Sequence, residues 1–155
     1  MKIHILAVGD RMPEWVETGY AEYAKRLPRE CSLVLHEIPA GKRGKNADLA
    51  RLTADEGRRL LAAVPKGARV VALDRSGREH DTVSLADVLR TQLGRGADLA
   101  LLIGGPEGLS DECLAAADER WSLSHLTFAH PVVRVVLAEQ LYRAWSIISN
   151  KPYHR

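Results

Sequence analysis

The stretch Leu99-Ala100-Leu101-Leu102-Ile103-Gly104-Gly105-Pro106-Glu107-Gly108-Leu109-Ser110 decides the fold of this chain. An unbroken apolar run ends at two adjacent glycines, which is typical of a strand buried on both faces of a parallel sheet. Ser110 is a good N-cap, and the acidic Asp111 and Glu112 suit the positive end of a helix dipole. In open α/β folds, ligands bind at such strand-to-helix corners. The stretch therefore predicts a small-molecule or cofactor site at the carboxyl edge of the sheet.

The rest of the chain alternates between strand and helix patterns. Strands are predicted over residues 3–8, 33–38, 69–74, 99–103 and 121–123. Helices are predicted over residues 13–27, 49–64, 111–120 and 132–150, with one more that begins at a capping box of Ser84 and Asp87. Arg75-Ser76-Gly77 is expected to turn away from the third strand. This alternation predicts an α/β fold, a mostly parallel sheet between helix layers, in one domain over residues 1–155.

Composition and charge limit the class of protein. Of 155 residues, 46% are hydrophobic and 27% charged, which is ordinary for a globular domain. The net charge of +2 and the isoelectric point near 8.6 fall short of the balance, above about 9, of a dedicated nucleic-acid binder. Two distant cysteines and no apolar run of about 20 residues predict a cytoplasmic protein without disulfides or membrane spans. The histidines lack ligand spacing, so no metal is expected.

The predicted helix over residues 132–150 is apolar on more than one side. Val133, Leu137, Leu141 and Trp145 form one apolar face, yet further apolar residues spread over most of the remaining circumference. A surface helix of a small domain needs only one apolar stripe. The pattern therefore predicts that a second copy of the chain covers the other side, in a homodimer.

Three loops are expected to meet at the carboxyl edge of the sheet. These loops follow Leu73, Ile103 and Leu123, and together they would cradle one ligand. The alternative is that Gly104-Gly105 only makes a turn, because the motif is neither GxGxxG nor a P-loop.

Two polar segments are open to more than one interpretation. The basic run of residues 41–46 is either a phosphate-binding loop or a solvated one. Residues 150–155 carry an aromatic ring, an imidazole and a guanidinium, but by composition alone they are an ordinary frayed chain end.

Several segments together resemble the SPOUT class of RNA methyltransferases, and within it the bacterial large-subunit (23S) rRNA pseudouridine N3-methyltransferase family. The resemblance covers the whole chain and is carried by Leu102-Ile103-Gly104-Gly105-Pro106-Glu107-Gly108, Trp121-Ser122-Leu123-Ser124, His130-Pro131-Val132-Val133-Arg134, Glu139-Gln140-Leu141-Tyr142-Arg143-Ala144, Ile38-Pro39-Ala40-Gly41-Lys42-Arg43-Gly44-Lys45-Asn46 and Pro152-Tyr153-His154-Arg155.

The resemblance implies a C-terminal trefoil knot, which topology rules alone would exclude. It also implies a homodimer and methylation of N3 of a pseudouridine on the assembled ribosome. The implied cofactor is S-adenosylmethionine, held by Leu73, Gly104, Gly105, Leu123, Ser124, His125, Leu126, Thr127 and Phe128. Lys42, Arg43 and Lys45 are the candidate rRNA contacts.

The candidate catalytic residues are drawn from the last helix and the tail. His154 is expected to accept the N3 proton, because imidazole titrates near working pH. Arg155 would hold phosphate or stabilise the developing anion, and Tyr153 would stack on the base. Glu139 and Arg143 would line or orient the site. The alternatives are a SPOUT methyltransferase with another RNA target and a non-catalytic ribosome-binding factor.

Overall fold

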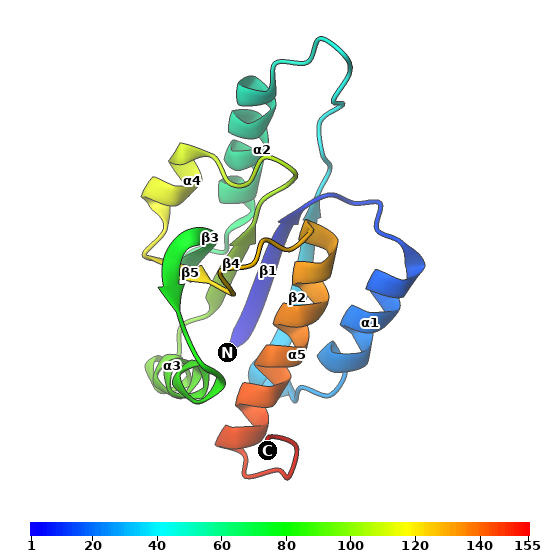
Figure 1. The fold of residues 1–155 in the computed structure, drawn as a ribbon. Coiled ribbons are helices and arrows are strands. Elements are labelled where there is room, and N and C mark those ends of the chain that lie inside the picture. The colour runs from blue at the N-terminus through cyan, green and yellow to red at the C-terminus, as the bar shows by residue number, and fades with distance from the viewer.

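The structure is a computed structural model that describes all residues, 1–155. Its core is one five-stranded sheet of strand order β2-β1-β4-β3-β5, in which every neighbouring pair is parallel (Figure 1). The elements in chain order are β1 Lys2–Val8, α1 Glu14–Ala24, a 3₁₀ turn Arg29–Cys31, β2 Ser32–Ile38, α2 Leu49–Ala63, β3 Arg69–Glu79, α3 Thr82–Arg95, β4 Leu99–Ile103, α4 Asp111–Ala116, β5 Glu119–Ser122 and α5 His130–Ile148. The predicted α/β class and parallel sheet are confirmed.

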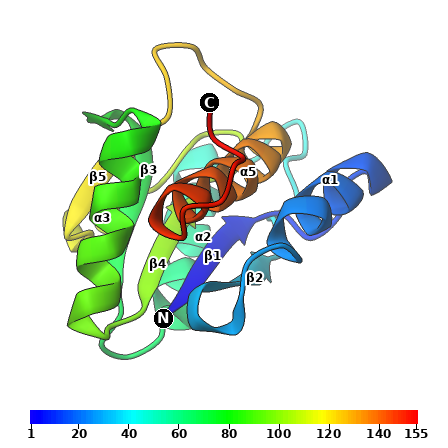
Figure 2. The ribbon, with the colours of Figure 1, turned by 90° about the horizontal axis from the view of Figure 1, so that it is seen from below.

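Helices cover both faces of the sheet. Ile3 and Ile5 of β1 pack in a core cluster with residues of α3 and α5, whereas Leu6 and Val8 pack with Leu60 of α2 and with α4. Figure 2 shows α5 between α1 and α3 on one face, with α2 on the other. The alternation of side chains along β1 explains why this strand is apolar at nearly every position.

Side-chain caps start three of the helices. Asp48, Asp81 and Ser110 accept hydrogen bonds from the backbone N–H groups of Arg51, Ser84 and Cys113. The Ser110 cap was predicted, but the Ser84–Asp87 capping box was wrong. Asp81 is the cap, and Ser84 lies in the first turn as its donor, because the helix begins three residues earlier than the predicted Ser84 cap indicated.

Strand β3 is longer than predicted. Arg75-Ser76-Gly77 does not turn away, because the strand runs on to Glu79 and pairs again with β5 after a register shift between Leu73 and Arg78. A Cβ on Gly77 would lie 2.6 Å from backbone atoms of Trp121, so this close approach requires glycine. Residues 119–120 belong to β5, so the predicted helix over 111–120 ends early, at Ala116.

The two apolar sides of α5 are covered mainly within the chain. Leu137, Leu141 and Ala144 are buried in the core, and Val135 packs against Gly19 of α1. The inference that a second copy is needed to bury this helix was therefore too strong. Positions 132, 136, 139 and 143 share the outward face, where Val132 and Val136 stay partly exposed. None of the helices is both long and apolar enough to span a membrane.

Candidate functional site

A cavity of about 610 Å³ opens at the carboxyl edge of the sheet. It lies where the loops after β3, β4 and β5 meet the first turn of α5, so the predicted convergence of these three loops is confirmed. Its lining residues are Leu73, Asp74, Arg75, Ile103, Gly104, Gly105, Pro106, Glu107, Gly108, Trp121, Ser122, Leu123, Ser124, Leu126, Thr127, Phe128, Ala129, His130 and Val133.

The cavity takes in all but one of the residues expected to hold the cofactor. The exception is His125, whose side chain is 95% exposed and places Nε2 3.3 Å from Glu79 Oε1. His125 borders a separate polar hollow with Asp74 and Arg75 instead. A loop pattern does not reveal which of six consecutive side chains points inward, so the role of His125 in binding the cofactor stays a prediction.

The glycine corner is built by close backbone packing. A Cβ on Gly104 would lie 2.3 Å from the carbonyl carbon of Gly108, so the absent side chain makes room for the loop itself. Gly105 and Gly108 pair in an isolated bridge, and Gly108 has a φ of 80°, in the left-handed region that favours glycine. Close packing of the loop on itself therefore accounts for the glycine at position 104.

The loop between β5 and α5 forms another wall of the cavity. Ser122 Oγ donates to the carbonyl of Ser124, whose own hydroxyl accepts from the backbone N–H of Leu126. The Leu126 side chain is 71% exposed at the rim of the cavity. This wall therefore offers the Leu126 side chain to a ligand, while its serine hydroxyls bond within the loop.

His130, at the start of α5, is a cavity residue that stood out in the sequence only as part of the motif His130-Pro131-Val132-Val133-Arg134. Its Nδ1 is buried without a hydrogen-bond partner. Burial lowers the pKa of this imidazole, and the nearby charges of Arg134 and Arg43 lower the pKa further. The ring is therefore neutral at pH 7. Below it, Arg134 is 1% exposed and donates to Gly9 and Glu37.

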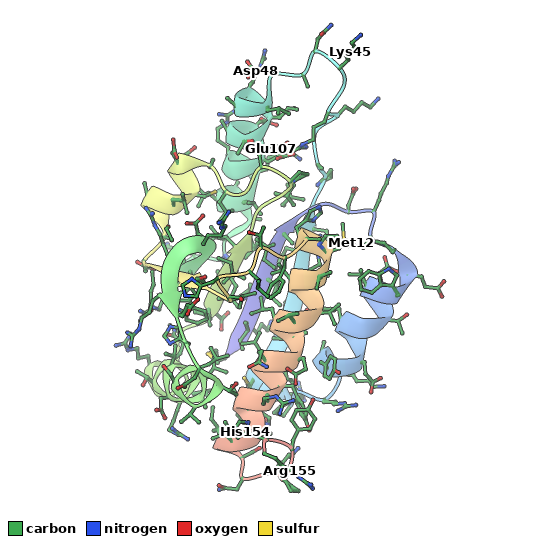
Figure 3. All side chains as sticks on the ribbon, in the orientation of Figure 1. Met12, Lys45, Asp48, Glu107, His154 and Arg155 are labelled. Atoms are coloured by element: carbon green, nitrogen blue, oxygen red, sulfur yellow. The ribbon has the colours of Figure 1, made fainter.

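The basic loop presents two lysines but not the arginine. Lys42 and Lys45 are exposed, and Figure 3 shows Lys45 projecting at one extremity of the molecule. Arg43 instead points inward and pairs with both Glu56 and Glu107. These hydrogen bonds raise the pKa of the guanidinium. The partners lie 13 and 64 residues away in sequence, so a local charge pattern could not reveal them.

The candidate catalytic residues lie along the second half of α5, from Glu139 onward, and in the tail that follows it. Tyr153 Oη donates to Glu139 Oε1 at 3.1 Å, and the Arg143 guanidinium lies 4.7 Å from the Tyr153 ring centroid. Burial and the Glu139 carboxylate raise the pKa of Tyr153. His154 and Arg155 are exposed (Figure 3). The structure therefore brings Glu139, Arg143 and Tyr153 together, and the tail is not simply frayed.

One chain does not bring this set to its own cavity. The cavity adjoins His130 at the first turn of α5, and the tail follows its last turn. Nineteen residues of helix separate the two ends, about 28 Å at the rise of an α-helix. The predicted cofactor and catalytic residues are therefore two separate groups within one chain.

Comparison with known proteins decides the family. The family model described as "Predicted SPOUT methyltransferase" matches residues 1–154. The chain belongs to the SPOUT methyltransferase family. A protein named ribosomal RNA large subunit methyltransferase H, from Thioalkalivibrio sulfidiphilus, is 63% identical over 100% of this chain and 99% of its own length. The protein of the same name from Methylococcus capsulatus is 57% identical over 100% of both chains.

Solved structures share the fold of this SPOUT methyltransferase at low sequence identity. A probable methylase family protein from Haemophilus influenzae Rd KW20 superposes with a TM-score of 0.55 at 13% identity, over 99% of this chain and 70% of that one. A structure titled "Structural insights into the 2-OH methylation of C/U34 on tRNA" superposes with a TM-score of 0.54 at 18% identity, over 94% of this chain and 91% of that one.

Proposed function

We propose that this SPOUT methyltransferase transfers a methyl group from S-adenosylmethionine to N3 of a pseudouridine in large-subunit rRNA, on the assembled ribosome. The observation that carries the proposal is the full-length match, at 63% and 57% identity, to two proteins named ribosomal RNA large subunit methyltransferase H. The cavity at the glycine corner supports it, because it lies on the residues expected to hold the cofactor.

The cavity fits a molecule of this kind. Its volume of about 610 Å³ lies within the usual range for small-molecule sites, about 300–1,000 Å³. Leu73, Gly104, Gly105 and residues 123–128 would hold S-adenosylmethionine, with His125 at the outer edge. When bound, this cofactor supplies a methyl group made electrophilic by its positive sulfur. Apolar walls such as Leu73 and Phe128 exclude water from that methyl group.

A second copy of the chain would complete the site. If the outward faces of α5 pair about a twofold axis perpendicular to the helix, the two helices run antiparallel, and the tail of one protomer lies toward the cavity end of the other. Val132 and Val136 provide the apolar part of this face, and Glu139 and Arg143 the polar part. The separation of tail and cavity along one α5 is the observation that favours this homodimer.

The tail would then act on the target base. His154 would accept the proton of N3, and Arg155 would stabilise the negative charge that develops on the base as the N3–H bond breaks. Tyr153 stacks on the base and is itself held by Glu139, whose carboxylate also binds Arg143. Holding both reactants in one geometry supplies much of the acceleration.

Lys42 and Lys45 would contact rRNA phosphates. Both side chains are exposed on a loop beside the cavity, whereas Arg43 is occupied by carboxylates. A net charge of only +2 fits an enzyme that recognises a large target by its shape as well as by contacts with its phosphates. The protein is expected to act in the cytoplasm, where ribosomes are.

Mass spectrometry of rRNA tests the function in cells. In cells that lack the gene, the large-subunit rRNA should lose one N3-methylpseudouridine, and a plasmid copy should restore it. Loss of a methyl group from another nucleotide would instead support a SPOUT methyltransferase with a different RNA target. Unchanged rRNA would support a non-catalytic ribosome-binding factor.

A further inference from the structure

Arg43 joins two segments that are far apart in the sequence. Its Nη1 and Nη2 donate to the two carboxylate oxygens of Glu56 on α2, each at 2.8 Å. Its Nε and Nη2 also donate to Glu107 Oε2, at 2.9 and 2.6 Å. Glu107 lies in the turn between Gly105 and Gly108, so one guanidinium connects helix α2 to the glycine corner of the cavity.

The anchor of this connection is the buried carboxylate. Glu56 is 3% exposed, and Oε2 accepts a further hydrogen bond from the backbone N–H of Gly41. Arg43 Nη1 donates back to the carbonyl of Gly41. Although burial raises the pKa of Glu56, its hydrogen bonds from Arg43 and Gly41 leave it below the ordinary value. The carboxylate therefore stays charged and holds the guanidinium in place.

Arg43 reaches the cavity only through its neighbours. It is not among the lining residues, yet its Nη2 lies 3.6 Å from the position of a Cβ on Gly105, and its charge is felt at His130. We propose that Arg43 is a positioning residue, which holds the Gly105–Gly108 turn against α2 in the shape that binds the cofactor. The identity of that cofactor rests on the proposed function.

The same contact links the two ligand sites. Lys42 and Lys45, the candidate rRNA contacts, flank Arg43 on the loop that Gly41 fastens to Glu56. A phosphate that shifts this loop would also shift Arg43, the side chain that holds Glu107 of the glycine corner. Only arginine suits this position, because its planar fork serves two carboxylates at once, whereas lysine offers a single ammonium.

Binding of S-adenosylhomocysteine, measured by isothermal titration, tests the inference with two variants and a control. Glu107→Gln releases the turn and keeps the buried Arg43–Glu56 pair, and Arg43→Lys keeps the charge but loses the fork. Each should raise Kd about tenfold, and the double variant should bind no more weakly than the single variants, because the contact between Arg43 and Glu107 is lost in all three. Asp55→Asn, which removes the exposed pairs with Arg58 and Arg59 on α2, should leave Kd unchanged.

If Arg43 only stabilised the fold, the variants would melt at lower temperature but would not show equal, non-additive increases in Kd. A Kd within twofold of wild type for Arg43→Lys, or additive losses in the double variant, would overturn the inference. Amide exchange of residues 104–109 in the ligand-free protein separates it from the proposed function. Faster exchange in Glu107→Gln supports the proposal that Arg43 holds the Gly105–Gly108 turn, even if the wild-type protein fails to bind the probe. Unchanged exchange overturns the proposal.

Discussion

Single residues show where a local sequence pattern reaches its limit. Gly104 and Gly105 were placed correctly at the cavity, but packing against the Gly108 backbone explains Gly104, not room for a ligand. The surroundings of His130 and Arg43 were not predicted because they come from distant segments: Gly9 lies beside the first, and Glu56 and Glu107 bind the second. Which atoms surround a side chain is set by tertiary packing, which periodicity does not encode.

The first residue-scale prediction concerns Gly104. Replacing it with alanine places a Cβ 2.3 Å from the Gly108 carbonyl carbon, so the backbone of the turn must shift. We expect Gly104→Ala to lower the free energy of unfolding by about 1–3 kcal/mol and to weaken cofactor binding. Chemical denaturation measures the first effect and titration the second. Gly94→Ala on α3, where a Cβ meets nothing within 4 Å, is the matched control.

The second residue-scale prediction concerns pH. His4 Nδ1 and His36 Nε2 lie 3.0 Å apart, and His4 Nε2 lies 3.1 Å from Asp98. Burial, together with the charge of His4, lowers the pKa of His36. The unfolded chain therefore binds more protons, and stability is lost as pH falls below about 6.5, the ordinary histidine value. Melting temperature should drop by a few degrees between pH 7.5 and 5.5. A His36→Gln variant should have a shallower slope, and an equal slope would refute this origin.

At the scale of elements, the predicted strands and the order of helices were largely correct, because buried parallel strands are continuous apolar runs. The errors fell where strand pairing overruled a local pattern, a turn in one case and the end of a helix in the other. Arg75-Ser76-Gly77 continues β3 through a register shift, and residues 119–120 pair as β5. Strand pairing depends on a partner segment more than 40 residues away, so a window of sequence does not predict it.

The element-scale prediction concerns the outward face of α5. Val136 is partly exposed there, and Val83 of α3 is 53% exposed elsewhere. If the proposed homodimer forms through α5, Val136→Glu should shift sedimentation toward monomer and abolish methyl transfer, because an unpaired charge at an interface is costly. Val83→Glu should leave both unchanged. A wild-type protein that sediments as a monomer at micromolar concentration would contradict the dimer.

At the scale of the whole molecule, the account depends on two groups of residues, one at the cavity where α5 begins and one along its second half and the tail. Their residue types and motifs were read from the sequence, but their separation was not, since it follows from the three-dimensional course of a 19-residue helix. The trefoil knot implied by the family resemblance stays a prediction.

His154→Ala should lower methyl transfer at least about 100-fold, the usual scale for a general base, with little change in stability because the side chain is exposed.

The most direct test is methylation in a purified system. Ribosomes from cells lacking the gene are incubated with the protein and tritiated S-adenosylmethionine, and the rRNA nucleosides are then separated and identified by mass. The account predicts one methyl group per large subunit, on N3 of a pseudouridine, with wild-type protein, and nearly none with His154→Ala. Label on any other nucleotide, no label at all, or wild-type rates with His154→Ala would contradict it.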